Sequence, residues 1–253
     1  MKSCTFTNDG NIQINLIDDP KSNLFSSRDN HEVLFRRINT HLINKKIITR
    51  NIIDLGAWIG DNSIPWAKNI DGIVYAIDPS PTNIKFINDM CIINNIENIK
   101  CIERAISDKC EIVSTNDCID HCSFVYNNSA NNGKNKFEAV SLDYLYEHNI
   151  LNDIGYIHLD VEGMEFRILQ GSTNIIDKFR PVITFEQHLQ IDDYDLILNF
   201  LKSKNYITFL IDEVLPGCRT DCRNSISFPQ EIYTDDIIEQ IHNMLKINIL
   251  ISK

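Results

Sequence analysis

Two strand-like runs of this sequence end in residues that could bind a nucleoside. The run 51–55 leads into a turn that contains Gly56 and Gly60, and the run 72–78 ends in Asp78. A glycine turn between a strand and a helix presents backbone N–H groups to a ligand, and a carboxylate at the end of the neighbouring strand accepts the hydroxyls of a ribose. Together the two features indicate a nucleoside cofactor.

The spacing of the glycines distinguishes between classes of cofactor. A dinucleotide fingerprint reads G-x-G-x-x-G, and its middle glycine lets a pyrophosphate approach the backbone. Here the turn reads G-x-x-x-G, and Ala57 and Trp58 occupy the space that a pyrophosphate needs. The pattern therefore favours S-adenosylmethionine over a nicotinamide or flavin cofactor. A tight turn between strand and helix, without any ligand, is the structural alternative.

A second group of ionisable residues follows the apolar run 154–159. Asp160, Glu162 and Glu165 crowd one strand end. Carboxylates this close together can raise a pKa, recruit a metal ion or hold a cationic group. Glu165 falls in a first helical turn, so for this residue we expect an interaction with the helix dipole instead.

Histidines and cysteines offer two further possibilities. His188 follows the run 181–185 and could act as a general base, with an ordinary loop histidine as the alternative. The segments 118–122 and 218–222 each hold two cysteines, and His121 could add a zinc ligand to the first. Both pairs enclose three residues, whereas the usual zinc knuckle encloses two. We therefore predict scattered reduced thiols and no metal site.

These residues require a scaffold in which strands alternate with helices. Strands are expected over residues 12–17, 51–55, 72–78, 99–103, 111–114, 123–126, 137–142, 154–159, 181–185, 206–211 and 225–228. Helices are expected over residues 31–43, 62–69, 81–95, 143–148, 165–169, 193–203 and 234–247, with a polar loop at 22–30. This alternation predicts an α/β fold, a mainly parallel sheet with helices on both faces and an antiparallel edge strand. We expect residues 1–49 to form a strand-and-helix cap on a single globular domain of residues 50–253.

The composition limits the class of partner. The 253 residues carry a net charge of −11 and their basic residues are scattered, so we expect no nucleic acid and favour a small or neutral acceptor. No segment resembles a signal peptide or reaches the length of a membrane span, which predicts a cytoplasmic protein. Isoleucine and asparagine supply roughly a quarter of the residues, which is typical of an AT-rich genome such as that of a large DNA virus.

An ordered set of motifs resembles the FkbM family of S-adenosylmethionine-dependent methyltransferases. The motifs are Asp-Leu-Gly-Ala-Trp-Ile-Gly at 54–60, Ala-Ile-Asp-Pro-Ser-Pro at 76–81, Glu-Arg-Ala-Ile-Ser-Asp at 103–108 and Ile-His-Leu-Asp-Val-Glu-Gly-Met-Glu at 157–165. The resemblance covers roughly residues 50–190 and implies a class I methyltransferase fold. It also implies O-methylation of a carbohydrate or natural-product hydroxyl. The chain departs from the family at Trp58, where Asn is common, and at His158, where Lys is common.

The strand ends then assign the parts of the cofactor. Asp54 is expected to hold the ammonium group, Asp78 to accept the ribose hydroxyls, and Ala105 and Ile106 to border the adenine. Helix capping near Pro79 is the structural alternative for Asp78. The complete set of expected cofactor contacts is Asp54, Gly56, Ala57, Gly60, Asn62, Ser63, Asp78, Pro79, Ala105, Ile106 and Asp160.

Methyl transfer also limits what the acceptor side must provide. The protein has to hold the acceptor oxygen, the methyl carbon and the sulfur in line. A base or a metal ion helps to remove the proton of a hydroxyl as the new bond forms. Asp160 lies where class I methyltransferases often place an acceptor-side residue, and we predict catalytic roles for Asp160, Glu162 and His188. For His158 we expect a position in the core or against a helix.

The expected function is O-methylation of a sugar hydroxyl in a glycan or glycosylated product. A catalytically silent, cofactor-binding subunit that supports a partner enzyme is the alternative, and the intact Asp-Val-Glu-Gly element at 160–163 favours the enzyme. An RNA ribose methyltransferase would carry a Lys-Asp-Lys-Glu tetrad, but Asp160 has no obvious lysine at matching strand ends. The sequence predicts neither the acceptor nor the oligomeric state.

Overall fold

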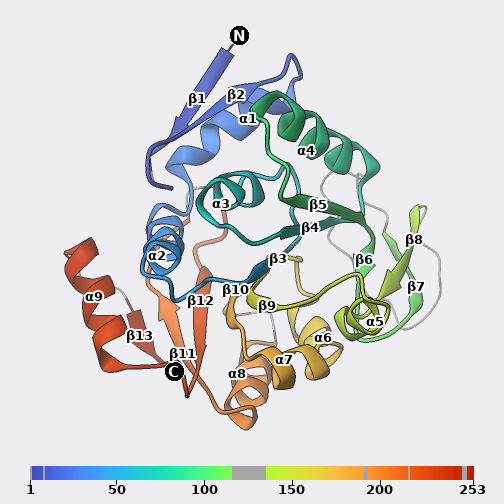
Figure 1. The fold of residues 1–253 in the computed structure, drawn as a ribbon. Coiled ribbons are helices and arrows are strands. Elements are labelled where there is room, and N and C mark those ends of the chain that lie inside the picture. Colours follow the sequence, from blue (N-terminus) through green and yellow to red (C-terminus); the bar gives the residue numbers. More distant parts are fainter. Residues whose placement is uncertain (1, 8, 116–134, 191–192, 216, 247–249) are drawn as a thin grey trace.

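A computed structural model describes residues 2–7, 9–115, 135–190, 193–215, 217–246 and 250–253. Its centre is an 8-stranded sheet (Figure 1). In spatial order the strands are β13 (Leu250–Ser252), β11 (Tyr206–Ile211), β12 (Cys222–Pro229), β10 (Val182–His188), β9 (Ile154–Leu159), β3 (Asn51–Leu55), β4 (Val74–Asp78) and β5 (Ile99–Glu103). The segment 118–122 and the strand expected at 123–126 lie outside the described residues.

The direction of the strands confirms the predicted fold class. From β5 to β10 every neighbouring pair is parallel. β12 runs antiparallel to both β10 and β11, and β13 runs antiparallel to β11 at the edge. Every residue of β3, β4 and β9 is buried, which is why these strands are almost continuously apolar in the sequence.

Helices cover both faces of the sheet, as predicted. Figure 1 shows one layer formed by α2 (Val33–Asn44), α3 (Ser63–Asn69), α4 (Pro81–Asn94) and α9 (Asp235–Leu245). The opposite layer consists of α5 (Leu142–Glu147), α6 (Glu165–Gln170), α7 (Thr173–Phe179) and α8 (Tyr194–Ser203). Each layer buries a hydrophobic cluster against the sheet, the first around Trp66 and Phe228 and the second around Leu159 and Phe185.

The N-terminal part of the chain packs against the first helical layer. β1 (Lys2–Phe6) and β2 (Ile12–Leu16) form an antiparallel pair, followed by α1 (Lys21–Ser27) and the 3₁₀ turn η1 (Arg28–Asn30). The prediction of a polar loop at 22–30 is therefore wrong. Phe25 anchors α1, because its ring lies fully buried with its centroid 5.1 Å from that of Phe6. Burial of this one aromatic ring is enough for the segment to form a helix, although its other residues are mostly polar.

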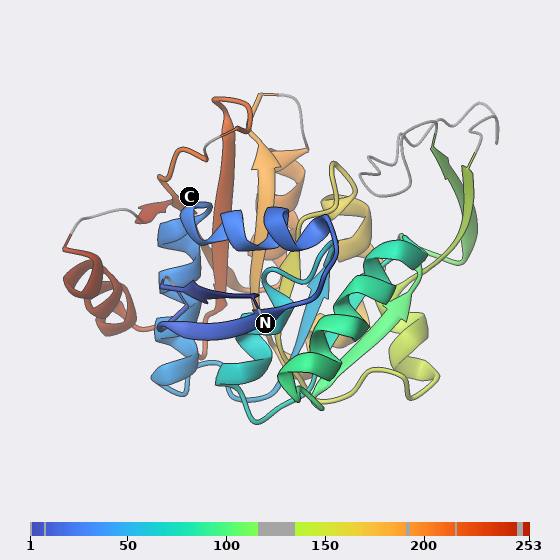
Figure 2. The ribbon, with the colours of Figure 1, turned by 90° about the horizontal axis from the view of Figure 1, so that it is seen from above.

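A separate 3-stranded sheet follows β5. It contains β6 (Ala105–Ile106), β8 (Asn135–Val140) and β7 (Glu111–Thr115), in that order. Figure 2 shows β7 and β8 extending away from the main sheet. The sequence predicted the strand at 111–114 but placed the second one two residues too late, at 137–142. It missed β1, α7 and β13, which are short and lack a clear apolar periodicity.

Candidate functional site

The glycine turn after β3 lies directly against the residue that follows β9. Gly56 has φ +75°, and a Cβ added to it would lie 1.8 Å from the backbone oxygen of Asp160. The backbone N–H groups of Gly56 and Ala57 both donate to the Ile77 carbonyl at the end of β4. Gly60 also has a left-handed backbone, with φ +74°. Only glycine fits at position 56, so the ends of β3, β4 and β9 converge on this turn.

Trp58 occupies the centre of the turn in a conformation that L residues rarely adopt. Its φ is +45°, and its backbone N–H donates to Asp78 Oδ2 over 3.0 Å. Asparagine tolerates such a left-handed backbone better than a bulky aromatic residue does. This explains in physical terms why asparagine suits this turn. The indole is held from outside by Arg28, whose Cζ lies 5.5 Å from the ring centroid.

Asp78 closes the end of β4 and is largely engaged by the protein itself. Its Oδ1 accepts from the Ser80 backbone N–H at 2.8 Å and from Asn83 Nδ2 at 3.1 Å, while Oδ2 accepts from Trp58. Burial raises the pKa of Asp78 to about 6, although these hydrogen bonds lower it. The helix cap of α4 is Ser80, whose hydroxyl accepts from the Asn83 N–H. Oδ2 keeps one lone pair, so Asp78 can accept one further hydroxyl.

Beneath the turn, Asp54 and Ser63 form a buried pair. Ser63 Oγ donates to Asp54 Oδ2 in a short hydrogen bond, and both side chains are essentially inaccessible. Burial raises the pKa of Asp54 to about 7. Asp54 therefore lies under the site rather than on its surface.

Asn62 is the residue at this turn whose hydrogen bonding is incomplete. Its Nδ2 lies 3.5 Å from Nε2 of His158. Its Oδ1 is buried, and within the described residues it has no hydrogen-bond partner. A buried amide oxygen without a donor suits a ligand that brings N–H groups of its own.

A buried ion network that the sequence analysis missed fixes the other side of the turn. The fully buried Arg36 of α2 donates through Nη2 to Asp61 Oδ2 at 2.7 Å and through Nη1 to the Asp61 carbonyl at 2.6 Å. Arg28 donates to the same carboxylate at 2.8 Å, and Asp9 and Glu32 lie 3.5 and 3.7 Å from Arg36. Burial alone would raise the pKa of Asp61, but Arg28 and Arg36 hold it below its usual value.

Ala105 and Ile106, expected to border the adenine, differ in position from Pro79, which was expected to contact the cofactor. Ala105 and Ile106 form β6, where they pair with Ala139 and Val140 of β8 and are buried. Pro79 is half-buried between Asp78 and α4. The structure thus gives Ala105 and Ile106 a role in the small sheet, and an adenine could contact only their outer edge.

Asp160 and Glu186 lie next to each other at the ends of β9 and β10. Leu159 of β9 is in register with Phe185 of β10, so the next residues, Asp160 and Glu186, are neighbours on one face. Burial and then the charges of Glu186 and Glu32 raise the pKa of Asp160 well above its usual value. Burial and then the charge of Glu32 raise the pKa of Glu186 to about 6. The pair retains a proton more strongly than ordinary carboxylates do.

The two other carboxylates of the 160–165 segment have separate roles. Glu165 is buried, and its carboxylate accepts from the backbone N–H groups of Val161 (3.1 Å) and Gly163 (3.1 Å). It therefore holds the loop that carries Asp160, in keeping with the structural role expected for it. Glu162 is exposed and has φ +53°, so it lies at the outer rim of the same loop.

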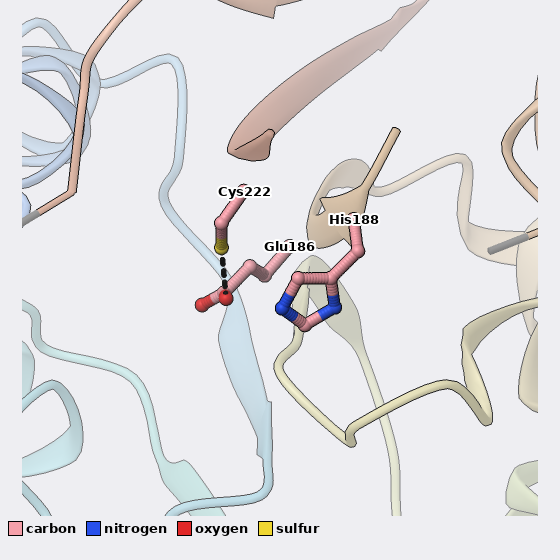
Figure 3. Close-up of side chains that lie close together, drawn as sticks. All are labelled: Glu186, His188 and Cys222. Atoms are coloured by element: carbon pink, nitrogen blue, oxygen red, sulfur yellow. Dashed lines mark hydrogen bonds between the residues drawn. The ribbon is translucent and has the colours of Figure 1, made fainter. Parts of the chain in front are cut away.

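The two candidate histidines have different surroundings. His158 lies in the core with its ring 5.0 Å from Phe35 and Nδ1 3.0 Å from Thr184 Oγ1, as expected for a core histidine. Burial lowers the pKa of His158 to about 4, so it is neutral. His188 instead ends β10, with its ring beside the Glu186 carboxylate (Figure 3). Of the two histidines, His188 is the one that lies beside Glu186.

Comparison with known proteins places this site in a family context. A family model described as Methyltransferase FkbM domain matches residues 54–208, more than half of the chain. A comparison with curated proteins found no match to this sequence. No helix of the described residues is long and apolar enough to cross a membrane.

Several solved structures of low sequence identity superpose on this chain. A methyltransferase FkbM from Methylobacillus flagellatus KT superposes with a TM-score of 0.52 at 17% identity, over 70% of this chain and 43% of that protein. The chain thus spans less than half of the length of that relative. Precorrin-6y C5,15-methyltransferase from Geobacter metallireducens GS-15 superposes with a TM-score of 0.47 at 13% identity, over 76% of this chain and 87% of that one. A Streptococcus mutans protein in complex with SAH superposes with a TM-score of 0.46 at 12% identity, over 75% of this chain and 95% of that one.

Proposed function

The chain belongs to the FkbM methyltransferase family, and we propose that it transfers a methyl group from S-adenosylmethionine to a hydroxyl of a sugar in a glycan or glycosylated product. The observation that carries the proposal is the family match over residues 54–208, within which the glycine turn, Asp78 and Asp160 meet at one edge of the sheet. The sugar hydroxyl follows from the usual chemistry of the family and from an acidic chain that does not favour a polyanionic acceptor.

The residues around the glycine turn fit this cofactor. The unpaired Asn62 Oδ1 can accept from the ammonium group, which makes Asn62 a better candidate for that contact than the enclosed Asp54. The remaining lone pair of Asp78 Oδ2 can accept one ribose hydroxyl. Gly56 lets this part of the backbone lie against Asp160, so the reactive end of the cofactor would face the acceptor side.

When bound, the cofactor supplies a methyl group already activated by a sulfonium. The chain then has to orient the acceptor oxygen and accept its proton. Asp160 in its ionised form is the best placed proton acceptor, because its backbone carbonyl adjoins the turn and an ionised carboxylate with a raised pKa is a stronger base. His188, two residues beyond Glu186, can take up the proton next.

Two measurements in sequence test this proposal. Calorimetric titration with S-adenosylmethionine, S-adenosylhomocysteine and NAD should give binding for the first two and none for NAD. Transfer of a labelled methyl group to a panel of neutral oligosaccharides should then identify the acceptor. Binding without transfer to any acceptor would favour the silent subunit, and binding of NAD alone would contradict the proposal.

Substitution of Asp160 tests the mechanism separately. Asp160→Asn should keep the affinity for the cofactor and lower kcat by roughly 100-fold or more, as the loss of a general base does. Glu162→Gln is the matched comparison, because it removes a carboxylate from the same loop at its exposed rim. Equal losses in both variants would mean that the loop acts through its charge rather than through one proton acceptor.

A further inference from the structure

We propose that Glu186, His188 and Cys222 form a binding site for a divalent transition-metal ion, Zn²⁺, at the end of β10 and the start of β12. Each residue offers one ligand atom, and these atoms all lie within 4.8 Å of one another. Figure 3 shows the three side chains turned toward one another. The proposal concerns the binding of an ion and not a step of methyl transfer. It shares His188 with the proposed reaction, and the ring nitrogen that binds the ion could not take up a proton at the same time.

The backbone alone brings these side chains together. His188 and Cys222 are direct partners in the antiparallel pair of β10 and β12. Side chains of directly opposed residues lie on the same face, with Cβ atoms about 5 Å apart. Glu186 lies two residues before His188 on the same strand and therefore points to the same face. The strand register fixes the juxtaposition, whatever rotamers the side chains adopt.

The distances need only small adjustments to enclose a zinc ion. With Zn–S near 2.3 Å and Zn–N and Zn–O near 2.1 Å, the ligand atoms of a tetrahedral site lie about 3.5 Å apart. Cys222 Sγ now donates to Glu186 Oε1 over 2.5 Å, and the widest separation in the set is at most 4.8 Å. Rotations about side-chain bonds bring these values to the required spacing. The ion would replace the thiol proton that now links Cys222 to Glu186.

The donor set selects the class of metal. A thiolate, an imidazole and a carboxylate are ligands that Zn²⁺ accepts together, whereas Mg²⁺ and Ca²⁺ prefer oxygen atoms alone. Cys218 is a candidate for a fourth donor, because its thiol lies close enough to Cys222 to interact with it electrostatically. Its sulfur lies 3.7 Å from His31 Nε2. The cysteine spacing at 218–222 did not predict this metal site, because two of the donors, Glu186 and His188, come from another strand.

The charges around the cluster favour a cation. The carboxylates of Glu32 and Glu162 interact electrostatically with Glu186. The carboxylate of Asp160 interacts in the same way with Cys222. The neighbouring cations are already engaged, since Arg219 pairs with Asp221 at 3.0 Å and Arg223 with Asp212 at 3.7 Å. The cluster thus adjoins a negative edge of the molecule.

A zinc titration of the full chain tests the site. Protein stripped with a chelator is titrated with Zn²⁺ against a chromophoric competitor, and the same protein is titrated with Co²⁺ to follow the thiolate-to-cobalt charge-transfer band. We expect one equivalent of metal and a clear thiolate band. Cys222→Ser should reduce that band to what Cys218 alone supplies, and both Cys222→Ser and His188→Gln should weaken Zn²⁺ binding by at least about 100-fold. Cys218→Ser should weaken it by roughly 10-fold.

Matched controls separate this site from other thiols and imidazoles. Cys110→Ser and His148→Gln change exposed residues elsewhere and should leave the affinity for Zn²⁺ unchanged. Circular dichroism of each variant checks that it is folded, and His188→Gln tests the site even where Cys222→Ser does not fold. Absence of stoichiometric binding overturns the proposal. Undiminished binding by folded Cys222→Ser also overturns it and assigns the metal to other residues, such as those of 118–122.

Discussion

Asp78 has one role in the fold and a second, proposed role in cofactor binding. Asp78→Ala removes the acceptor of two backbone N–H groups, those of Trp58 and Ser80, and should cost about 1–3 kcal/mol of stability. It should also weaken binding of S-adenosylmethionine at least 10-fold, because the ribose loses its acceptor. Calorimetry measures the affinity, and urea unfolding measures the stability.

A control variant shows whether the loss is specific to this carboxylate. Asp153→Asn removes an exposed carboxylate that pairs with Arg50 before β9, and it should change neither the affinity nor the stability appreciably. If Asp78→Ala binds the cofactor as tightly as the wild type, the ribose assignment fails. Asp78 is then a residue of the turn alone.

Asp54 gives a prediction about pH. Its pKa is about 7 in the folded chain and near 3.8 when unfolded, so its protonated form stabilises the fold. That contribution is complete below pH 4 and is lost as pH rises through about 7. Asp54→Asn cannot ionise and still accepts from Ser63. It should therefore gain about 2.5 kcal/mol over the wild type between pH 5 and pH 8. Urea unfolding at both pH values checks this, and an equal difference at the two values would contradict it.

Single residues also show what the sequence could and could not predict about the site. Gly56, Asp78 and Asp160 follow from strand ends, because parallel strands bring their carboxyl ends to one edge. The Glu186–Cys222 contact depends on the pairing of two strands far apart in the chain. The incomplete hydrogen bonding of Asn62 depends on how His158 packs. Such facts require tertiary contacts that no local pattern encodes.

Among the elements, α2 and the glycine turn are joined by Arg36. Arg36→Met keeps the apolar length of the side chain but leaves Asp9 without its buried cation and leaves Asp61 and Glu32 with Arg28 alone. Breaking a buried ion pair by removing one partner costs about 3–5 kcal/mol. We expect a loss of that size in the free energy of unfolding, measured in urea, and weaker cofactor binding because the turn loses its support.

Arg37 provides the matched control, since it is the next residue on the same helix and is exposed. Arg37→Met should change stability by less than about 0.5 kcal/mol. Similar losses in both variants would mean that the helix, and not the ion network, responds to the substitution.

The sequence predicted the buried strands well. It predicted poorly those segments whose secondary structure depends on the burial of a single side chain. β3, β4 and β9 are apolar throughout, and the pattern located each of them. The segment 22–30 is polar, yet Phe25 is enough to fold it onto the first helical layer. β6, β7 and β8 form a small sheet of their own, which the alternation of strands and helices could not separate from the main one.

The charge of the whole molecule gives the last prediction. The chain carries −11, and Asp160, Glu162, Glu186 and Glu32 add to the negative potential at the proposed acceptor side. Polyanions are repelled by such an edge, whereas a neutral sugar is indifferent to it. Methyl transfer to a neutral oligosaccharide should therefore change by less than about 2-fold between 0.05 and 0.2 M salt, because no charged contact is screened. A single-stranded RNA should neither bind at either salt concentration nor be methylated. Tight RNA binding that weakens steeply with salt would show a basic surface and would replace the sugar by a nucleic acid as the proposed acceptor.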